Sequence, residues 1–354
     1  MIPVYIFLFF ISILLAFVFT PLTIVLCRKF NVYDWPGRRK VHTRPIPRWG
    51  GFAIFLSCLL CFILAYYLFP KFQSVLSYRL EDTKSRFVSS IYIQTQVIGI
   101  LIGSALVLIL GMTDDKKPVP AFTKLLVQII AAYCTMDFGV RILGLNLPFG
   151  IEINFRKNEL LILASQFITV FWLIGFMNTI NLIDGLDGLA TGIVAIASGT
   201  FFIIAILLKP DKIWLTRQLQ MSAALSITLC GACLGFLFFN FNPAKIFLGD
   251  CGSLLTGFLL ASISITGTLK TPLVISLFIP VIIVALPILD VILSIFRRIR
   301  KGISIMEPDK EHIHHRLLKL GWTHREVVLV MYVITLVLSL FTVSFTALKL
   351  TLKP

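Results

Sequence analysis

Apolar residues fill about ten membrane-length stretches of this chain, and polar residues gather mainly at the junctions between them. An α-helix needs about 20 apolar residues to cross the ~30 Å hydrocarbon core of a bilayer. The predicted transmembrane helices are 3–27, 51–69, 90–111, 121–142, 160–178, 189–208, 219–239, 253–269, 272–296 and 327–349. The pattern therefore predicts an all-α integral membrane protein in which residues 1–354 form a single polytopic membrane domain.

The composition supports this prediction, because 58% of the 354 residues are hydrophobic and only 14% are charged. A soluble domain cannot bury so much apolar surface. The first stretch lacks a preceding basic region and is about twice as long as a signal-peptide core, so we expect a retained helix. Residues 146–155 alternate around a Pro/Gly turn, which predicts a short external β-hairpin. Residues 70–89 are expected to form an exposed connector.

The unusual polar residues follow only the first, third, fifth, seventh and ninth spans. Each helix reverses the direction of the chain, so these five junctions emerge on one side of the membrane, where we expect them to build one site. They hold 19 of the 32 Lys and Arg residues, counting Lys124 just inside its helix. Because Lys and Arg mark cytoplasmic loops, the site should face the cytoplasm from the inner (plasma) membrane, with both chain ends outside.

The net charge of +15 lies on loops that flank the membrane. That placement favours anionic lipid or a phosphorylated substrate, and not nucleic acid, as the partner.

Asp114 and Asp115 end the third span. Two adjacent acids at a helix C-terminus, which already carries partial negative charge, require a compensating cation. The compensating charge comes either from the neighbouring Lys116 and Lys117 or, in a functional site, from a divalent metal ion or the cationic surroundings of a substrate.

The fifth junction gathers amides, acids and glycine between two apolar helices. Its candidate residues are Asn178, Asn181, Asp184, Gly185, Leu186 and Asp187. Asp184 or Asp187 alone would cap the next helix. Capping does not explain the full set, and glycine lets a planar ligand approach the backbone, so we predict a substrate pocket.

The seventh junction places Lys245, Phe247 and Asp250 ahead of the eighth span. Asp250 or Ser253 alone would serve as a helix cap. An acid beside a lysine, an aromatic ring and two glycines at a helix N-terminus is more typical of a phosphate and metal site.

The last cytoplasmic junction contains Asp309, His312, His314, His315 and Arg316. On a helix most of these residues lie along one side, which suits an anionic ligand. A zinc site is an alternative, but no Cys joins the cluster and the His spacing matches no common ligand pattern. A solvated basic face is the second alternative.

Three more residues are candidates. Lys40 and Arg48 precede the second span and are assigned to phosphate contact, with anchoring at the cytoplasmic membrane surface as the alternative. Asp290 lies inside the ninth span, where an ionisable residue is a functional candidate by default. The two Cys-x-x-Cys pairs lie inside apolar spans and are expected to pack as small hydrophobes.

Four ordered motifs resemble the polyprenyl-phosphate N-acetylhexosamine-1-phosphate transferase family over about residues 1–350. They are Gly-Met-Thr-Asp114-Asp115-Lys, Asn178-x-x-Asn181-Leu-Ile-Asp184-Gly-Leu-Asp187-Gly-Leu-Ala, Phe247-Leu-Gly-Asp250-Cys-Gly-Ser and His312-Ile-His314-His315-Arg-Leu. The resemblance implies transfer of a sugar-1-phosphate from a UDP-sugar to undecaprenyl phosphate or another polyprenyl phosphate, with Mg²⁺ (or Mn²⁺) and release of UMP. This reaction begins a cell-surface glycan pathway, such as cell-wall, lipopolysaccharide or teichoic acid synthesis.

The resemblance also implies individual roles. The Pro287-to-Asp290 stretch and the histidine motif resemble the GlcNAc-type members, so UDP-GlcNAc is the expected donor. Asp250 resembles the Mg²⁺ ligand, assisted by Asp115, and Phe247 resembles the ring that stacks on uracil. The uridine pocket would contain Asn181, Asp184, Gly185, Leu186 and Asp187; Asp114 and Asp115 would prepare the lipid phosphate; His312, His314, His315 and Arg316 would contact the diphosphate and sugar.

Two other functions are weighed. An intramembrane prenyltransferase also uses paired aspartates, but Asp114-Asp115 lacks the further spaced acid of such sites. An ion-coupled transporter needs charged groups at the membrane midplane, and only Asp290 approaches that depth. A homodimer is left open.

Overall fold

The computed structural model describes residues 1–36, 44–80, 91–146, 152–267, 317–318 and 320–351, with isolated positions 281, 285, 289 and 300. Seven predicted site residues lie outside these described residues: Lys40, Asp290, Asp309, His312, His314, His315 and Arg316. Most of the predicted ninth span, 272–296, lies outside them as well.

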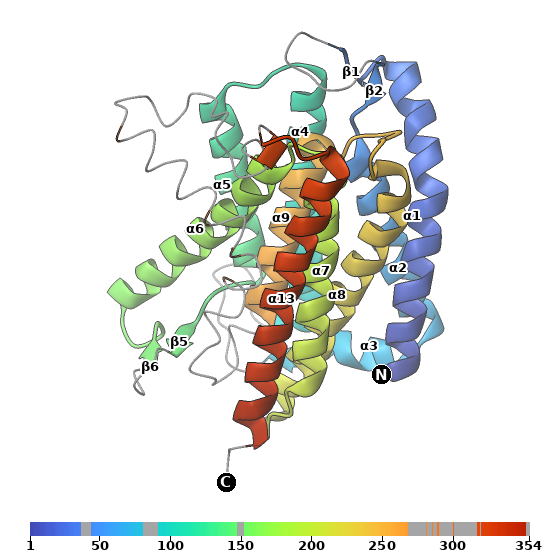
Figure 1. The fold of residues 1–354 in the computed structure, drawn as a ribbon. Coiled ribbons are helices and arrows are strands. Elements are labelled where there is room, and N and C mark those ends of the chain that lie inside the picture. Colours follow the sequence, from blue (N-terminus) through green and yellow to red (C-terminus); the bar gives the residue numbers. More distant parts are fainter. Residues whose placement is uncertain are drawn as a thin grey trace.

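Helices account for nearly all of the described structure, which confirms the all-α prediction (Figure 1). Their bounds are α1 (Ile2–Phe30), α2 (Gly50–Leu68), α3 (Pro70–Leu76), α4 (Ile93–Lys116), α5 (Ala121–Asp137), α6 (Glu159–Ile183), α7 (Leu189–Leu207), α8 (Ile213–Asn240), α9 (Gly249–Thr266) and α13 (His324–Thr351). Among the described residues, eight of these helices are long and apolar enough to cross a membrane. α5 matches the fourth predicted span but has only 17 residues.

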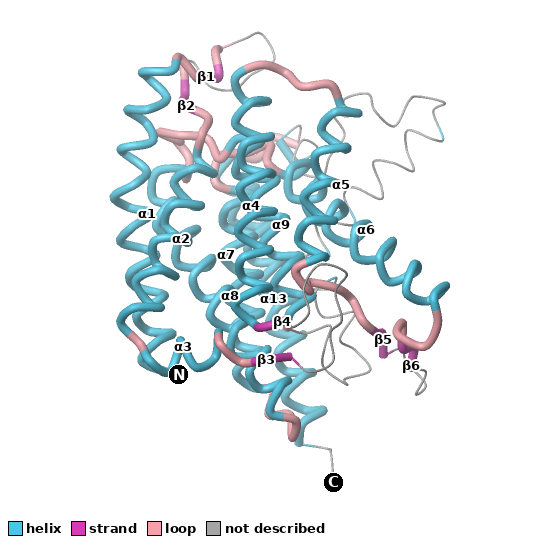
Figure 2. The backbone as a smooth tube through the Cα atoms, turned by 180° about the vertical axis from the view of Figure 1, so that it is seen from behind, coloured by secondary structure: helices cyan, strands magenta, loops and turns pink. Residues whose placement is uncertain are grey.

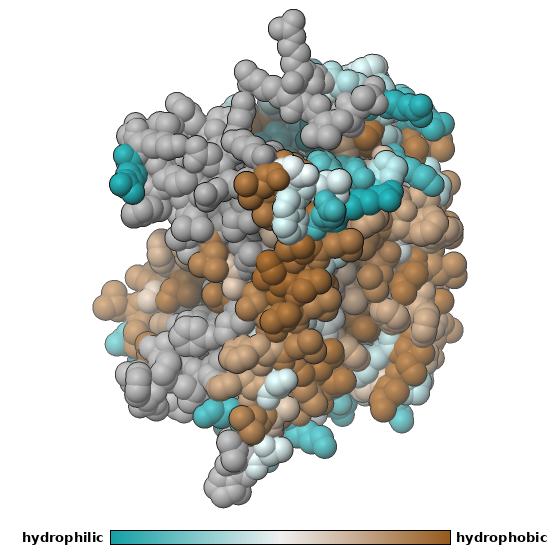
Figure 3. Space-filling view, viewed as in Figure 1, coloured by the Kyte–Doolittle hydropathy of each residue, from teal (hydrophilic) through white to brown (hydrophobic). Residues whose placement is uncertain are grey.

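The membrane-spanning character is visible on the surface of the bundle. Hydrophobic residues form a broad band across the visible face, and hydrophilic residues gather at its two ends (Figure 3). α1, α6 and α13 are the most exposed spans, whereas α9 is almost entirely buried and forms the centre of the bundle. The described chain is thus a multi-pass membrane protein with one shared helical core.

Within the described residues, three short antiparallel strand pairs lie between the helices (Figure 2). They are β1 (Tyr33–Asp34) with β2 (Ile46–Pro47), β3 (Arg79–Leu80) with β4 (Ile91–Tyr92), and β5 (Gly144–Asn146) with β6 (Glu152–Asn154). The last pair confirms the predicted hairpin. β3 and β4 lie at the end of the bundle that also holds both chain ends.

The expectation that residues 70–89 form an exposed connector is wrong for its first part. α3 begins there, and Phe72 and Val75 are fully buried. Phe72 packs edge-on against Phe62 of α2, with ring centroids 5.6 Å apart. The amphipathic turn therefore gains more from burying its apolar side than a solvated loop would.

Two glycines allow α1 and α8 to approach each other closely. On α8, a Cβ at Gly231 would lie 2.5 Å from the Phe9 carbonyl oxygen, and one at Gly235 would lie 2.4 Å from that of Ile13. This small-xxx-small spacing lets α1 pack directly on the α8 backbone, as in other membrane helix pairs.

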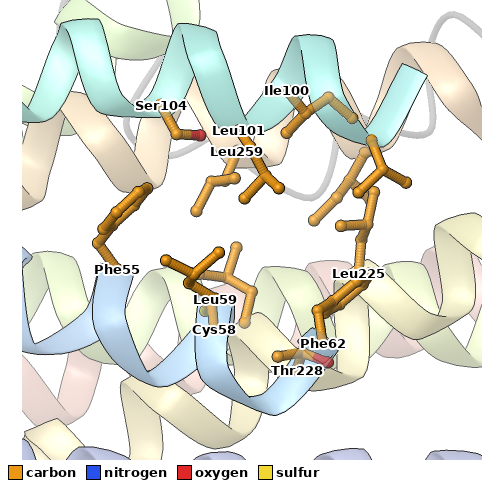
Figure 4. A pocket seen from close by; sticks show the side chains of 13 residues that line it. Phe55, Cys58, Leu59, Phe62, Ile100, Leu101, Ser104, Leu225, Thr228 and Leu259 are labelled. Atoms are coloured by element: carbon orange, nitrogen blue, oxygen red, sulfur yellow. The ribbon is translucent and has the colours of Figure 1, made fainter. Parts of the chain in front are cut away.

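A small apolar cavity of about 40 Å³ lies between α2, α4, α8 and α9 (Figure 4). Phe55 and Phe62 of α2 face Leu101 and Ser104 of α4 across it. The Ser104 hydroxyl is buried there without a hydrogen-bond partner. The cavity is far too small for a lipid chain, so we treat it as a packing defect of the core.

Candidate functional site

The predicted one-sided site is present within the described residues. The segments 31–36, 44–49, 117–120, 184–188 and 241–248 and the start of α13 meet at the end of the bundle opposite both chain ends (Figure 1). A cavity of about 1060 Å³ opens there. It is lined by the predicted residues Arg48, Asp184, Gly185, Leu186, Asp187, Lys245 and Phe247, and also by Arg28, Asp34, Arg44 and His324, which sequence reasoning did not select.

Glycines bring the backbones of α2, α4 and α9 together beneath this cavity. A Cβ at Gly51 would lie 2.4 Å from the Gly252 backbone, and one at Gly111 would lie 2.2 Å from the Cys251 backbone. The backbone amide of Gly50 donates to the Phe247 carbonyl (3.1 Å). These approaches fix the loop that carries Phe247, and the first turn of α9 that carries Asp250, against the ends of two other helices.

Asp115 holds the first turn of α9 from the end of α4. Its Oδ1 accepts a hydrogen bond from the backbone N–H of Asp250 (2.9 Å), and its Oδ2 accepts one from that of Cys251 (3.1 Å). A helix N-terminus leaves such donors without intrahelical partners, so this buried carboxylate caps α9 across the tertiary structure. Gly249 adopts φ +73°, and a Cβ there would lie 2.5 Å from Asp115 Oδ2.

Arg48 supplies the counter-charge for this capping carboxylate. Its Nε lies 3.4 Å from Asp115 Oδ1, and its Nη1 lies 3.5 Å from Asp34 Oδ1. Burial lowers the pKa of Arg48, but the nearby carboxylates of Asp115 and Asp34 outweigh that effect and raise it. Arg48 therefore stays cationic at the edge of the cavity.

Lys124 of α5 is a cation that Asp114 and Asp250 share. Its Nζ forms an ion pair with Asp114 and lies 3.1 Å from Asp250 Oδ2. Asp114 Oδ1 also accepts from the backbone N–H of Val119 (2.7 Å). The alternative partner Lys116 instead lies over the Phe30 ring. Sequence reasoning counted Lys124 only for topology; the signal it offered was a lysine in the first turn of an apolar helix soon after the acid pair.

Neither acid of the fifth junction caps α7. The N-cap of α7 is Gly188, at φ 80°, with no side-chain cap. Asp187 Oδ2 instead accepts from Asn242 Nδ2 (2.9 Å) and from the backbone N–H of Ala244 (3.1 Å). Asp187 thus joins the 184–188 segment to the 241–248 loop across the cavity wall.

Asp184 lines the same cavity and follows the last residue of α6. Burial raises the pKa of Asp184 well above its ordinary value, and the negative charges of Asp250 and Asp115 raise it further. Keeping a buried acid of this kind ionised costs free energy, and such perturbed groups are typical of functional positions.

Asn178 and Asn181 connect helices and do not line the cavity. Asn178 Nδ2 donates to Gln128 Oε1 of α5 (2.9 Å), and Asn181 Nδ2 donates to Ser253 Oγ of α9 (2.8 Å). The Ser253 hydroxyl donates to the Gly249 carbonyl (3.0 Å). The structure therefore places these two amides beneath the pocket, where they fix α5, α6 and α9 relative to one another.

The acids present fit a hard divalent cation better than a soft one. Asp114 and Asp250 offer only carboxylate oxygens, and Mg²⁺ commonly takes one or two carboxylates together with substrate phosphates and water. Among the described residues, no group of three His, Cys, Asp or Glu side chains is arranged to hold a metal ion. A cation here would therefore be completed by oxygen atoms of the substrates.

Comparison with known proteins adds the family. Residues 97–268 match the model of "Glycosyl transferase family 4". The chain is 36% identical over 332 residues to a protein of Bacillus subtilis (strain 168) described as a probable undecaprenyl-phosphate N-acetylglucosaminyl 1-phosphate transferase, covering 94% of this chain and 82% of the relative.

The chain is also similar to two further relatives. A decaprenyl-phosphate N-acetylglucosaminephosphotransferase of Mycobacterium leprae (strain TN) is 36% identical over 328 residues, covering 88% of this chain and 76% of that one. A phospho-N-acetylmuramoyl-pentapeptide-transferase of Lactobacillus gasseri is 38% identical, but over 242 residues, 65% of this chain and 69% of that one. The chain therefore belongs to glycosyl transferase family 4, the family that it shares with these N-acetylglucosamine-1-phosphate transferases and with the muramoyl-pentapeptide transferase.

Proposed function

We propose that this chain transfers GlcNAc-1-phosphate from UDP-GlcNAc to undecaprenyl phosphate and releases UMP, with Mg²⁺ as the cofactor. The observation that carries the proposal is the arrangement of Asp114 and Asp250 around Lys124, next to a cavity of about 1060 Å³ at one end of a membrane bundle. Such a site can take a nucleotide from the aqueous side while the lipid acceptor stays in the bilayer.

The acceptor needs little activation. A phosphate monoester has a second pKa of about 6, so most of it is dianionic at neutral pH. One acceptor oxygen attacks the phosphorus that carries the sugar. The bond between that phosphorus and the oxygen shared with UMP then breaks, and UMP leaves with the electron pair. We favour this direct attack over an aspartyl-phosphate intermediate.

Charge neutralisation and positioning are the main demands of such a transfer. Arg48 and Lys124 provide positive charge beside the phosphates, and Asp114 orients the acceptor. Mg²⁺, when bound, neutralises charge on the phosphate oxygens, and Asp250 together with substrate oxygens would hold it. Because both oxygens of Asp115 already accept backbone hydrogen bonds, we assign it to positioning Asp250.

The donor occupies the cavity in this proposal. Phe247 stacks on uracil, and the 184–187 segment surrounds the nucleoside, with Lys245 at the rim; all of these residues line the cavity. The predicted phosphate contact of Lys40 and the candidate roles of Asp290 and Asp309 stay predictions, because these residues lie outside the described residues. The same holds for the predicted contacts with the diphosphate and sugar, which were assigned to His312, His314, His315 and Arg316. A homodimer also stays a prediction.

The site end of the bundle is proposed to face the cytoplasm from the inner membrane, where UDP-sugars are made available. The concentration of Lys and Arg at that end supports this orientation. This orientation can be tested with single cysteines placed in the 241–248 loop and in the β5–β6 turn. Each cysteine would be labelled from inside and from outside sealed vesicles.

The function is tested by incubating the purified protein with undecaprenyl phosphate, Mg²⁺ and each of UDP-GlcNAc, UDP-GalNAc and UDP-MurNAc-pentapeptide. We expect UMP release with UDP-GlcNAc and its loss in Asp250→Asn. Release only with another donor would contradict the sugar assignment. No release with any donor, or transport without release in proteoliposomes, would contradict the transferase.

A further inference from the structure

His324 is a polar residue of the cavity that the reaction described above does not use. It is the first residue of α13, and it lines the cavity with Asp184, Asp187 and Phe247. Both of its ring nitrogens are buried, and neither makes a hydrogen bond with the part of the chain that the structure describes. Buried polar atoms without partners are rare in folded proteins, because each one loses its hydrogen bonds to water without replacement.

The start of α13 is held firmly, so a loose helix end does not explain this residue. Thr323 and Glu326 form a capping box: the Thr323 backbone N–H donates to Glu326 Oε2 (2.7 Å), and the Glu326 backbone N–H donates to the Thr323 hydroxyl (3.4 Å). Two reciprocal bonds of this kind fix the first turn of a helix.

The same helix is tied to both segments that meet at Asp187. Arg325 Nε donates to the Asn242 carbonyl (3.1 Å), on the loop whose Asn242 side chain reaches Asp187. The Tyr332 hydroxyl donates to the Gly188 carbonyl (2.5 Å), one residue beyond Asp187. His324 therefore occupies a defined place against the cavity wall that the 184–188 segment and the 241–248 loop form.

The ring can present a nitrogen to the cavity without moving the backbone. A half-turn about the Cβ–Cγ bond exchanges each nitrogen with a ring carbon, and this torsion has broad, roughly two-fold minima. An imidazole nitrogen then offers either a donor or an acceptor to a ligand.

From this geometry, and resting on the proposed function, we infer that His324 is a donor-binding residue whose ring nitrogen hydrogen-bonds the UDP-sugar in the cavity. The ligand class is a nucleotide, because the same cavity is lined by the cations Arg28, Arg44 and Arg48 together with an aromatic ring. His324 thus has the partner in the complex that it lacks in the free protein.

The test compares His324→Phe with the wild-type protein. Phe keeps the ring size and removes both nitrogens, so the variant should fold with an equal or higher melting temperature. The donor KM should rise about tenfold or more, while the acceptor KM changes less than about twofold. A tenfold rise corresponds to a loss of about 1.4 kcal/mol in binding free energy. His324→Gln, which restores a donor and an acceptor, should recover part of the loss.

Trp322→Phe is the matched control, because Trp322 is a ring near the same helix start but does not line the cavity. It should leave the donor KM unchanged. Calorimetric titration of UMP and of UDP-GlcNAc, without acceptor, measures the contact independently of turnover. Weaker binding of either nucleotide to His324→Phe supports the inference; wild-type affinity for both overturns it.

The outcomes of this test and of the transferase assay are separable. If wild-type protein released no UMP from any UDP-sugar, the proposed function would fail whatever His324 does. If wild-type protein is active and His324→Phe keeps both its donor KM and its nucleotide affinity, only the inference about His324 fails.

Discussion

Asp115 and Asp250 lie side by side at the start of α9, and their Asn variants should fail for different reasons. Asp115 accepts two backbone hydrogen bonds with its two oxygens (2.9 and 3.1 Å). In Asp115→Asn one oxygen remains, and the new NH₂ group faces a backbone N–H. The variant loses one charge-assisted hydrogen bond and leaves a buried donor unpaired, which costs about 1–3 kcal/mol. Arg48 also loses its buried counter-charge.

The kinetic consequence follows from the position of Asp250 on the loosened turn. A displacement of about 1 Å at a reacting centre can lower a rate about a hundredfold. Asp115→Asn should therefore melt at a lower temperature and lose about a hundredfold in kcat. Asp250→Asn keeps the backbone bonds to Asp115, so it should melt like the wild type and still lose at least about a hundredfold in kcat.

Melting of the purified variants in detergent, followed by fluorescence, and UMP release over a range of Mg²⁺ concentrations separate the two roles. An Asp115→Asn protein with the wild-type melting temperature, no activity and a Mg²⁺ requirement shifted as in Asp250→Asn would refute the capping role. It would make Asp115 a direct ligand. Near wild-type turnover of Asp250→Asn at low Mg²⁺ would remove Asp250 from the metal site.

Three further changes test the cavity and the acid cluster. Phe247→Ala should raise the donor KM about ten- to a hundredfold, a lost stack of about 1–3 kcal/mol, with the acceptor KM unchanged; an unchanged donor KM places uracil elsewhere. Lys124→Met leaves Asp114 and Asp250 without their shared cation, so kcat should fall about a hundredfold. Lys124→Arg keeps the positive charge and should retain more activity; equal kcat values for the two variants would exclude a role for the charge. The pKa of Asp184 is raised on folding, so its ionisation costs stability as pH rises above the unfolded value of about 4. Asp184→Asn should therefore melt higher than wild type at pH 7, with the difference shrinking toward pH 4, while donor binding weakens; a pH-independent difference would contradict the cause given.

The hydrophobic pattern by itself determined the class of the protein and predicted that its polar groups gather at one end of the bundle. Helical spans in a bilayer need unbroken apolar stretches, and every span reverses the chain, so both conclusions follow from linear order alone. The candidate acids Asp114, Asp184, Asp187 and Asp250 were recognisable because a charged residue at a span end is conspicuous. The β5–β6 hairpin was equally local, since alternation around a turn is a short-range signal.

Only the tertiary structure decided what each of these groups contacts. Asp115 meets the α9 backbone 135 residues away, and Lys124 meets Asp250 across 126 residues. Those contacts depend on how closely α2, α4 and α9 approach at their glycines, which no local pattern specifies. The same packing turned Asn178 and Asn181 toward other helices and brought His324 to the cavity. Sequence order places polar groups at one end of the bundle, but helix packing selects which of them line the cavity.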